Sequence, residues 1–583
     1  MANSLSQKKK HHPLYISTKR MDLMNYLSLK ISYNSPPKPK FTYYNHINEQ
    51  NIPFRSSQKP KICAPIQSLM GTNSSYNTKS APSLFTNIID RPLHPSVDPK
   101  HVFTGNFAPV DELGPTECPV VDGKLPDSLT GTYIRNGPNP QHMPRGPLHF
   151  FEGDGMLHSM QLSKGRAIYS SRYVKTYKYK LERDAGGQIF PNVFSGFYGL
   201  VDMVQCVAST ARVLMGHVNL KKGFGLANTS LAFFSSKLLA LGESDLPYII
   251  KCTREGDIET LGRWDFDEEL FASMTAHPKT DMTTKETFAF KFSPFFSPHL
   301  TFSRFDANGV KQKDVPILSI NRPTFIHDFA ITKRFAIFSE TQLAVSAANV
   351  MLGKGMPTVF DPEKVPRIGI ILKYATSDAE MKWFNVPGFN AMHVFNAWEN
   401  GEDEVVLIAT NATSIENLFL KVDMVHISLE KVRINLRTGN VSRNILSARN
   451  LELGSINSSY IGKKNRYVFV GVGKEIPKMQ GVVKIDLEKE IEVSRRFYGP
   501  GCFGGEPLFV PRNGDHVDAA DEDDGFVVTY IHDENYGESK FLVMDAKSPN
   551  LDIVAAVKLP RRVPYGFHGL FVHEENHSNQ KSL

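Results

Sequence analysis

The feature that most constrains the fold is a succession of short β-forming runs that continues from residue 131 almost to the end of the chain. Each run is rich in β-branched or aromatic residues and lies between Gly, Pro, Asn or Asp residues that favour turns. Helices do not alternate with these runs, so the sequence predicts an all-β barrel, sandwich or propeller rather than an α/β fold. Examples are "GTYIRNGPNPQ" (131–141), "HFFEGDGMLHSMQL" (149–162), "TFAFKFSP" (287–294), "LTFSRFDANGVKQKDVPIL" (300–318), "RYVFVGVG" (466–473), "GVVKIDL" (481–487) and "GFVVTYIHD" (525–533).

The length of the β-rich region is compatible with a propeller. A chain of 583 residues exceeds one ordinary core, so it holds two to four domains or one large repeat architecture. We expect order from near Phe107, and residues 109–583 would divide into seven four-stranded blades of about 68 residues each. WD-type repeats do not occur in the sequence. Apolar residues at helical spacing predict a helix within 197–216, and 339–355 is a second helix candidate, both as inserts in the β-scaffold.

The net charge of +7 comes from the N-terminal segment. Residues 1–86 contain twelve Lys/Arg and two acids, a net +10, so residues 87–583 carry −3. A basic surface for nucleic acid is therefore not expected on the folded part. The segment is acid-poor, rich in Ser, Asn and Lys, and lacks a secretory apolar stretch, which predicts a plastid transit peptide and linker over 1–86 and one domain over 87–583. A plain disordered basic tail is the alternative.

The remaining composition excludes two classes of protein. No run of about 18 uncharged apolar residues occurs, so we expect no membrane-spanning helix. The five cysteines form no CxxC pair, which argues against a disulfide framework or a zinc cluster and favours a reducing compartment.

One histidine lies in an unusual setting. The stretch "RPTFIHDFAITKRFAIF" (322–338) predicts a strand buried on both faces, a tight turn at Lys333-Arg334, and a second strand over 335–338. His327 would share one face of the first strand with Phe325, Phe329 and Ile331. A buried histidine needs a partner, which is either a backbone carbonyl or a metal ion.

Three further histidines have apolar, strand-like or turn neighbours. The four are His277 in "SMTAHPK", His327, His393 in "AMHVFNAWEN" and His568 in "VPYGFHGLFV", with separations of 50, 66 and 175 residues. The first two separations are close to one blade, and the third is close to three blades. Histidines on the innermost strands of different blades would converge on the axis and could bind a transition metal. Spacing alone leaves two interpretations open, a metal site or four unrelated core histidines.

Nine motifs carry a resemblance to a known family. From about residue 109 to 573 the chain closely resembles the carotenoid cleavage oxygenase family, and within it plant carotenoid cleavage dioxygenase subfamily four. The 9-cis-epoxycarotenoid dioxygenases are the nearest alternative. The motifs, in the order of the family, are "FEGDGMLHS", "TAHPK", "IHDFAIT", "HVFNAWEN", "SARNLELGSIN", "GGEPLFVPR", "DEDDGFVVTYIHDE", "FLVMDAKSP" and "RRVPYGFHGLFV".

The resemblance implies a fold and a metal site. The implied fold is an all-β, seven-bladed β-propeller with a dome of helices and loops over a metal site on its axis. The implied cofactor is Fe(II), which would keep two open coordination positions, one of them for O₂. The implied iron ligands, which are also the implied catalytic residues, are His277, His327, His393 and His568. Three glutamates would hold ligand imidazoles by hydrogen bonds: Glu243 in "ALGESDLPY", Glu452 in "ARNLELGSIN" and Glu506 in "GGEPLFVPR".

The resemblance also implies a reaction. A carotenoid or apocarotenoid would be cleaved by O₂ at one conjugated double bond, at 9,10 (9′,10′) or at 7,8 (7′,8′), to give carbonyl products. A rigid polyene needs an apolar tunnel, and Phe567 and Met392, each next to a ligand histidine, are candidate walls or ordinary core residues. Residues 342–366 depart from the subfamily pattern and would line the substrate entrance.

Three alternatives remain open from the sequence. They are a 9-cis-epoxycarotenoid dioxygenase, a non-catalytic propeller used as a binding scaffold, and an enzyme of the same fold that acts on retinoids or stilbenoids.

Because carotenoids lie in membranes, we expect peripheral docking on a plastid lipid or plastoglobule surface through the apolar faces of 197–216 and 339–355.

Overall fold

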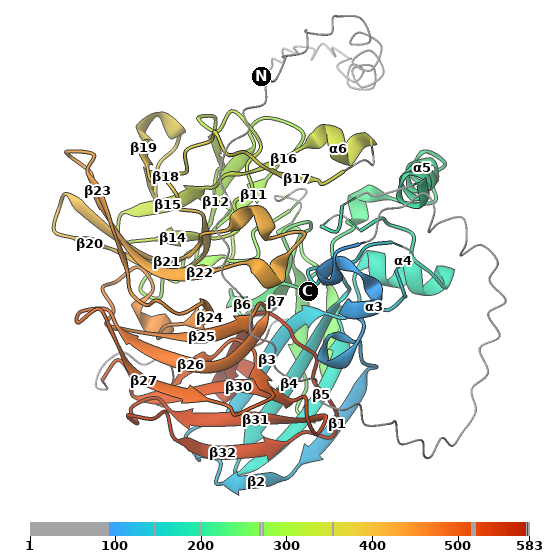
Figure 1. Ribbon diagram of the computed structural model, residues 1–583, viewed down its shortest axis with the longest axis vertical. Coiled ribbons are helices and arrows are strands. Elements are labelled where there is room, and N and C mark those ends of the chain that lie inside the picture. The colour runs from blue at the N-terminus through green and yellow to red at the C-terminus, as the bar shows by residue number, and fades with distance from the viewer. Residues whose placement is uncertain are drawn as a thin grey trace, which may run out of the picture. The chain divides into compact units, whose positions relative to one another are not determined.

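The structure is a computed structural model that describes residues 93–578 and 580, apart from 145, 193, 197–199, 268, 269, 271, 272, 353, 354, 513 and 515–520. These residues fall within the unit Ser80–Leu583. The predicted transit peptide and linker, with the boundary at 86/87, lie outside the described residues. The described part is built mainly of antiparallel strands, as the sequence predicted (Figure 1).

Three sheets are simple four-stranded meanders in which each strand pairs with the next along the chain. Short turns join the strands, which is the arrangement that short β-forming runs between turn residues favour. Their strands are β6 (Ser230–Phe234), β7 (Lys237–Leu241), β8 (Tyr248–Cys252) and β9 (Ile258–Arg263); β10 (Lys279–Thr280), β11 (Thr287–Phe292), β12 (Leu300–Phe305) and β13 (Val315–Ile317); and β20 (Ala391–Asn400), β21 (Glu404–Ala412), β22 (Ile427–Asn435) and β23 (Val441–Ile445).

A fourth sheet of four strands carries an insertion between its second and third strands. It consists of β14 (Phe329–Ile331), β15 (Phe335–Glu340), β18 (Arg367–Leu372) and β19 (Lys382–Asn385). The insertion contains the two-stranded sheet of β16 (Leu343–Val345) and β17 (Thr358–Phe360), with helix α6 (Ala347–Leu352) between them. The sequence stretch that departs from the subfamily pattern, 342–366, is this insertion.

The N-terminal and C-terminal parts of the chain meet in a five-stranded sheet. Its order is β1-β5-β4-β3-β33, and β33 (Gly569–His573) pairs antiparallel with β3 (Gly131–Pro138). The other members are β1 (Leu113–Cys118), β4 (Gly155–Ser163) and β5 (Arg166–Tyr173). The last strand of the chain is therefore held by one of the first.

The remaining strands form one ten-stranded sheet. Its path is β2-β32-β31-β30-β28-β26-β25-β24, with β27 on β26 and β29 on β30. The bounds are β2 (Val120–Gly123), β24 (Leu451–Ser455), β25 (Tyr467–Glu475), β26 (Lys478–Asp486), β27 (Ile491–Phe497), β28 (Cys502–Gly504), β29 (Leu508–Pro511), β30 (Gly525–Asp533), β31 (Glu538–Asp545) and β32 (Ile553–Lys558).

Helices are few and lie outside the sheets (Figure 1). The α-helices besides α6 are α3 (Pro99–Val102), α4 (Tyr177–Ala185), α5 (Leu200–Leu214) and α7 (Glu574–Ser578), and the 3₁₀ turns are η1 (Pro95–Val97), η2 (Gly105–Phe107), η3 (Leu220–Lys222), η4 (Asp378–Glu380), η5 (Ile415–Asn417), η6 (Val422–Met424) and η7 (Ser458–Tyr460). Helix α5 confirms the helix predicted within 197–216.

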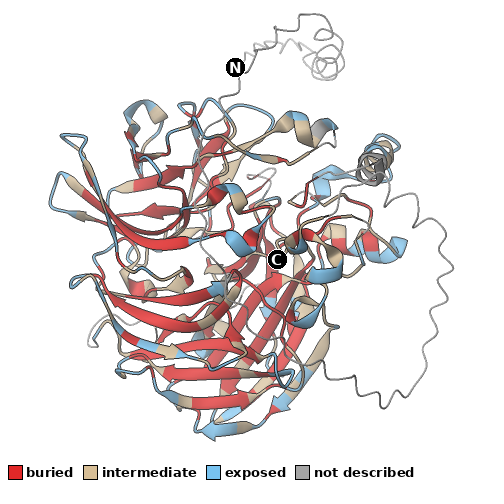
Figure 2. Ribbon diagram, viewed as in Figure 1, coloured by how far each residue is buried: buried red, intermediate tan, exposed pale blue. Residues whose placement is uncertain are grey.

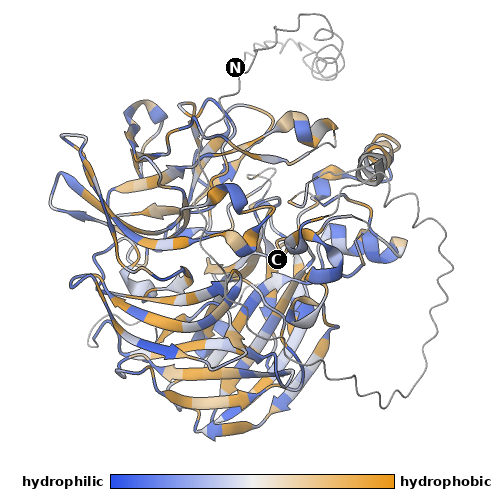
Figure 3. Cartoon of the chain, viewed as in Figure 1, coloured by the Kyte–Doolittle hydropathy of each residue, from blue (hydrophilic) through white to orange (hydrophobic). Residues whose placement is uncertain are grey.

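The core consists of apolar layers between neighbouring sheets. Buried residues run along the middle of the strands, while many strand ends and loops are exposed, and apolar and polar residues alternate along many strands (Figures 2 and 3). One layer joins β20–β22 to β24–β26 through Trp398, Ile408 and Val470, which are all buried. Similar layers join the β6–β9 sheet to β11 and β12, and β30–β32 to β3–β5.

Three details differ from the prediction. The first described element is η1, which lies before Phe107. The candidate helix 339–355 is shorter than predicted: the end of β15 and β16 occupy its first part, and the helix is limited to the six residues of α6. The strand predicted over 325–331 is limited to β14: His327 precedes it, and Thr324 instead forms a β-bridge with Ala344 of the insertion.

Candidate metal centre

The four predicted ligand histidines occupy equivalent positions in four different sheets. His277 lies two residues before β10, His327 two residues before β14, and His568 immediately before β33, while His393 is the third residue of β20. Each therefore lies at or just before the start of a strand at the edge of its sheet. This placement allows four side chains that are far apart in the sequence to meet.

The four imidazoles meet at one point. The Nε2 atoms of His277 and His327, of His327 and His393, and of His393 and His568 are each 3.1 Å apart. One ligand atom from each of the four lies within 4.8 Å of all the others. In the part of the chain that the structure describes, this is the group of His, Cys, Asp and Glu side chains arranged to hold a metal ion.

The spacing of the nitrogens fits a transition metal ion. Two nitrogens bound to one ion at about 2.1 Å are about 3.0 Å apart for a 90° angle and about 3.4 Å apart for a tetrahedral angle. The observed 3.1 Å separations are closer to the 90° angle of an octahedral ion. Four neutral imidazoles with no carboxylate among the ligands suit iron, copper, zinc or nickel rather than calcium or magnesium.

Three glutamates fix three of the imidazoles. Glu452 Oε1 accepts a hydrogen bond from His393 Nδ1 at 2.5 Å, and Glu506 Oε1 accepts one from His568 Nδ1 at 2.8 Å. Glu243, in the turn after β7, bonds Nδ1 of His327 in the same way. Because each Nδ1 donates its proton to a carboxylate, each Nε2 presents its lone pair to the centre.

The pKa shifts of His277 and His393 favour the neutral imidazole that binds metal, whereas that of His327 has the opposite sign. Burial and the neighbouring imidazoles of His327, His568 and His393 hold the pKa of His277 well below its ordinary value. Burial also lowers the pKa of His393, although Glu452 opposes this. For His327 burial again lowers the pKa, but the nearby Glu243 carboxylate outweighs it and the net pKa is raised. The side chains of His327, His393 and His568 are 12–13% exposed, so a small ligand can still approach them.

His277 differs from the other three. Among the described residues no carboxylate is hydrogen-bonded to its imidazole. Its main chain is held instead: its N–H donates to Thr275 Oγ1 at 3.1 Å, and the carbonyl before it, of Ala276, accepts from Ser230 Oγ. The orientation of this ligand therefore depends on the path of the chain.

Gly569, the residue after His568, allows a close approach of the main chain to Glu506 and Tyr133. Gly569 N donates to Glu506 Oε2 at 2.8 Å, so one carboxylate holds both the ligand and the next peptide. A Cβ at Gly569 would lie 2.8 Å from the hydroxyl of Tyr133, which is buried. Only glycine allows this close approach.

Six phenylalanines, which we call the aromatic wall, lie next to the histidines. Phe325 stacks on the ring of His327 at 6.0 Å between centroids, and Phe567 precedes His568. The members contact one another through rings 4.5–6.2 Å apart. The wall consists of Phe150, Phe151, Phe194, Phe325, Phe419 and Phe567.

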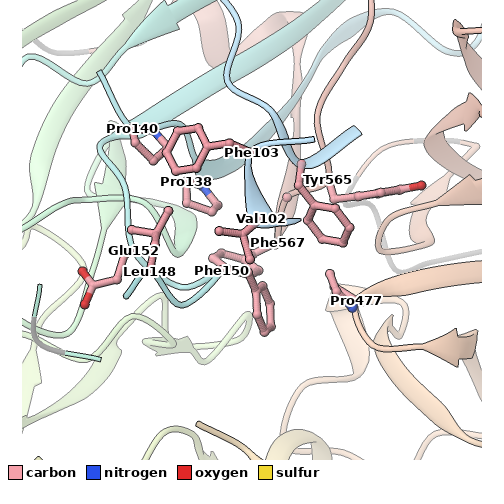
Figure 4. Close-up of a pocket in the computed structure, with 12 residues that line it drawn as sticks. Val102, Phe103, Pro138, Pro140, Leu148, Phe150, Glu152, Pro477, Tyr565 and Phe567 are labelled. Atoms are coloured by element: carbon pink, nitrogen blue, oxygen red, sulfur yellow. The ribbon is translucent and has the colours of Figure 1, made fainter. Parts of the chain in front are cut away.

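Of the two predicted tunnel residues, Phe567 belongs to this wall and Met392 lies in the same apolar cluster as two of its members, Phe325 and Phe419. Phe567 lines a small cavity of about 30 Å³ together with Phe150, Tyr565 and Pro477 (Figure 4). Met392 is buried in the apolar cluster that also includes Phe419, Phe325 and Leu343 of the insertion. A cavity of this size has room for about one water molecule, so this cavity by itself does not hold a polyene.

Sequence reasoning missed several of these residues. Phe325 was recognised only as part of a strand face, and Phe150 and Phe151 only as part of a β-forming run. Thr410 was not identified at all, although its hydroxyl accepts from His393 N at 3.0 Å. The available sequence signal for the wall was that Phe325 lies two residues before His327 and Phe567 lies directly before His568. No sequence signal pointed to Thr410, because it contacts His393 only in the folded structure.

Comparison with known proteins shows the family of the chain. The family model described as "Retinal pigment epithelial membrane protein" matches residues 107–573, most of the chain. The chain is 57% identical to the Arabidopsis thaliana protein named "Probable carotenoid cleavage dioxygenase 4, chloroplastic", over 85% of this chain and 86% of that one. It is 54% identical to a chloroplastic 9-cis-epoxycarotenoid dioxygenase of Oryza sativa subsp. japonica, over 83% and 77% of the two chains.

Two further similarities bear on substrate and metal. The chain is 52% identical to the chromoplastic zeaxanthin 7,8(7′,8′)-cleavage dioxygenase of Crocus sativus, over 60% of this chain and 96% of that one. Among solved structures it is similar to cobalt-substituted Synechocystis ACO, an apocarotenoid oxygenase, with a TM-score of 0.68 and 25% identity. That match covers 82% of this chain and 99% of the other.

Proposed function

The chain belongs to the carotenoid cleavage oxygenase family, and from this premise we propose that His277, His327, His393 and His568 bind the iron ion with which it cleaves a carotenoid oxidatively. The observation that carries the assignment is the convergence of four Nε2 atoms at 3.1 Å spacing, with three of the imidazoles oriented by glutamates. Fe(II) supplies the activation of O₂ that scission of a conjugated double bond into two carbonyl products requires.

The protein's own part in this reaction is to bind and orient. The aromatic wall offers an apolar surface for a polyene beside the histidines. Glu243, Glu452 and Glu506 keep three imidazoles in the tautomer that presents Nε2 to the ion. The substrate class follows from the relatives, whose names specify carotenoids or epoxycarotenoids.

We propose cleavage at 9,10 (9′,10′), with 7,8 (7′,8′) as the second candidate because the Crocus relative acts there. Neighbouring double bonds of a conjugated chain lie about 2.5 Å apart, and a misplacement of about 1 Å can cost about 100-fold in rate. The insertion reaches the site: Leu343 is buried in the cluster of Met392 and Phe419, and Phe360 packs against that cluster. Its side chains therefore set how far the substrate slides past Phe567 and Met392.

For the fold we propose a seven-bladed propeller. The apolar layers support it, because they join successive groups of four strands from β3–β5 through β30–β32 and back to β3–β5. In this interpretation the ten-stranded sheet consists of two blades, β24–β27 and β29–β32 with β2, joined by β28. The pairing of β33 with β3 closes the ring. Residues 87–583 would then form one domain.

We further propose a plastid protein that docks on a lipid or plastoglobule surface. Relatives named chloroplastic or chromoplastic support the plastid, and residues 1–86 would be the transit peptide and linker. No described helix is long and apolar enough to cross a membrane. The docking face would include Val207 and Leu214 of α5 and Leu352 of α6, which are 65%, 82% and 68% exposed.

One experiment tests the function directly. The protein, reconstituted anaerobically with Fe(II), is incubated in air with zeaxanthin, a 9-cis-epoxycarotenoid and an apocarotenal, and the products are identified by mass spectrometry. We expect about one iron per chain and aldehyde or ketone products from a single bond position. A folded, iron-loaded protein that leaves the whole panel intact would indicate a binding scaffold. Products confined to the 9-cis-epoxycarotenoid would indicate the epoxycarotenoid enzyme.

A chimera tests the role of the insertion. Residues 342–366 are replaced by the corresponding segment of the Arabidopsis relative, and products and iron content are measured. We expect a changed product distribution or substrate preference with unchanged iron content. Loss of iron, or the parent's products and rates across the panel, would contradict this role.

A further inference from the structure

A buried ion pair lies directly beside the ligand histidines. Lys279 Nζ and Asp328 Oδ1 are 2.8 Å apart, with side chains that are 17% and 3% exposed. Lys279 follows His277 by two residues, and Asp328 follows His327 by one. The pair therefore ties the chain segments of two ligands to each other.

The same pair also holds the segment of a third ligand. The N–H of Val394, the residue after His393, donates to Asp328 Oδ2 at 2.7 Å, and Lys279 Nζ donates to the carbonyl of Val394 at 3.3 Å. The register of β20 against β21 shifts on both sides of Val394, so the strand ladder does not fix the chain regularly at this point. The ion pair fixes it instead.

The pair matters most for the ligand without a glutamate. Three imidazoles are oriented through Nδ1, whereas His277 is oriented by its main chain. Lys279 ends the short segment that carries His277, and its ammonium group is anchored at Asp328. If Lys279 lost this contact, the segment that carries His277 would lose an anchor, and no glutamate would hold the imidazole in its place.

We propose that Lys279 and Asp328 are positioning residues, which hold the segments of His277, His327 and His393 in the arrangement that binds the metal. The inference rests on the proposed metal site. A buried pair of charges is weak as a source of stability, because desolvation cancels much of the attraction. Its value here is directional: the Asp328 carboxylate accepts hydrogen bonds from the N–H groups of Phe329 and Val394 and pairs with Lys279.

The test uses cobalt(II) as the probe and does not depend on turnover. The double variant Lys279→Met with Asp328→Asn removes both charges, so that no unpaired ion is buried. The matched control is Lys484→Met with Asp523→Asn, because Lys484 Nζ likewise binds one carboxylate, Asp523, and one backbone carbonyl, that of Ala546. Cobalt affinity, the visible d–d spectrum and the thermal midpoint of the metal-free protein are measured for each.

We expect the Lys279/Asp328 double variant to fold with a thermal midpoint similar to that of the control. Its affinity for cobalt should fall by about 10-fold or more, the scale seen for residues that orient metal ligands, and its spectrum should change. The control should keep the parent's affinity and spectrum. The single variant Lys279→Arg, which keeps the positive charge and hydrogen-bond donors opposite Asp328, should retain most of the parent's affinity for cobalt.

Three results would overturn the inference. They are parental cobalt affinity and spectrum in the double variant, an equal loss in the control, and failure of the double variant alone to fold, which would make the pair a folding element. A parent protein that binds neither cobalt nor iron would instead refute the proposed function, so the two failures can be distinguished.

Discussion

The glutamates behind the ligands should differ in how well they tolerate the neutral isostere glutamine. Glu452 accepts one hydrogen bond from His393 through Oε1. Glu506 accepts two, from His568 Nδ1 through Oε1 and from Gly569 N through Oε2. A glutamine has one accepting oxygen, so it can replace Glu452 at His393 but cannot serve both donors of Glu506.

The structure gives the size of the two effects. In Glu452→Gln a charge-assisted hydrogen bond becomes a neutral one, a loss of about 1 kcal/mol. In Glu506→Gln one buried donor is left facing an NH₂ group, which costs about 1–3 kcal/mol more. His568 can avoid this clash by moving its proton to Nε2, where it blocks metal binding. Since 1.4 kcal/mol is a factor of 10, we expect metal affinity to fall about 5-fold for Glu452→Gln and about 30- to 700-fold for Glu506→Gln.

The assay is a titration with cobalt(II) and Fe(II) against a competing chelator, made on both variants and on the parent. The thermal midpoint of each metal-free variant shows whether it is folded. Equal losses in the two variants, or a greater loss for Glu452→Gln, would refute the argument that the number of donors at each carboxylate sets the effect.

Three further predictions concern the ligands, the pH dependence of stability, and targeting. Alanine at any one of the four histidines should abolish turnover and lower bound iron below one per chain; full turnover in any of them would remove that residue from the site. Burial raises the pKa of Glu430, but its bonds to Arg443 and Asn411 outweigh this and the net pKa is lowered, so the pair stabilises the fold at neutral pH and this contribution is lost as pH falls below about 4.5 through the folded-state pKa. Arg443→Met should therefore cost about 3 kcal/mol in urea unfolding at pH 7 and less at pH 4, whereas a deficit that does not change with pH would contradict the ion pair. Residues 1–86 fused to a fluorescent protein should direct it to plastids, and cytosolic fluorescence would overturn the targeting prediction.

The convergence of the four histidines could be predicted because each lies in a short motif of the family that the chain resembles. The residues around His277, His327, His393 and His568 identify them without knowledge of the fold, and the structure places all four together. The same holds for the glutamates, since each lies in its own motif and each bonds the Nδ1 of one ligand.

The ion pair beneath the site could not be predicted in this way. Asp328 follows His327 directly in the sequence, but its hydrogen-bond partner Val394 is 66 residues away. No local pattern encodes a contact of that range. Local periodicity also extended the strand through His327, whereas Ile326, Phe329 and Ile331 all pack in one apolar cluster. Residues 326 and 329 would lie on opposite faces of a regular strand, so the chain bends at His327 and Asp328.

The charges around the histidines explain why a site assembled from four sheets keeps its form. Three carboxylates surround four imidazoles, and the side chains of Glu452 and Glu506 are only 6% exposed. Buried negative charge is costly unless it is paired, and hydrogen bonds from neutral imidazoles compensate it only in part. A divalent cation at the four Nε2 atoms would supply the missing positive charge, and the imidazoles of His327, His393 and His568 would each lie between it and a carboxylate. Metal binding and the packing of the sheets would therefore stabilise each other. His277, which has no such carboxylate, depends instead on the neutral contacts of its main chain and on the internally balanced pair of Lys279 and Asp328.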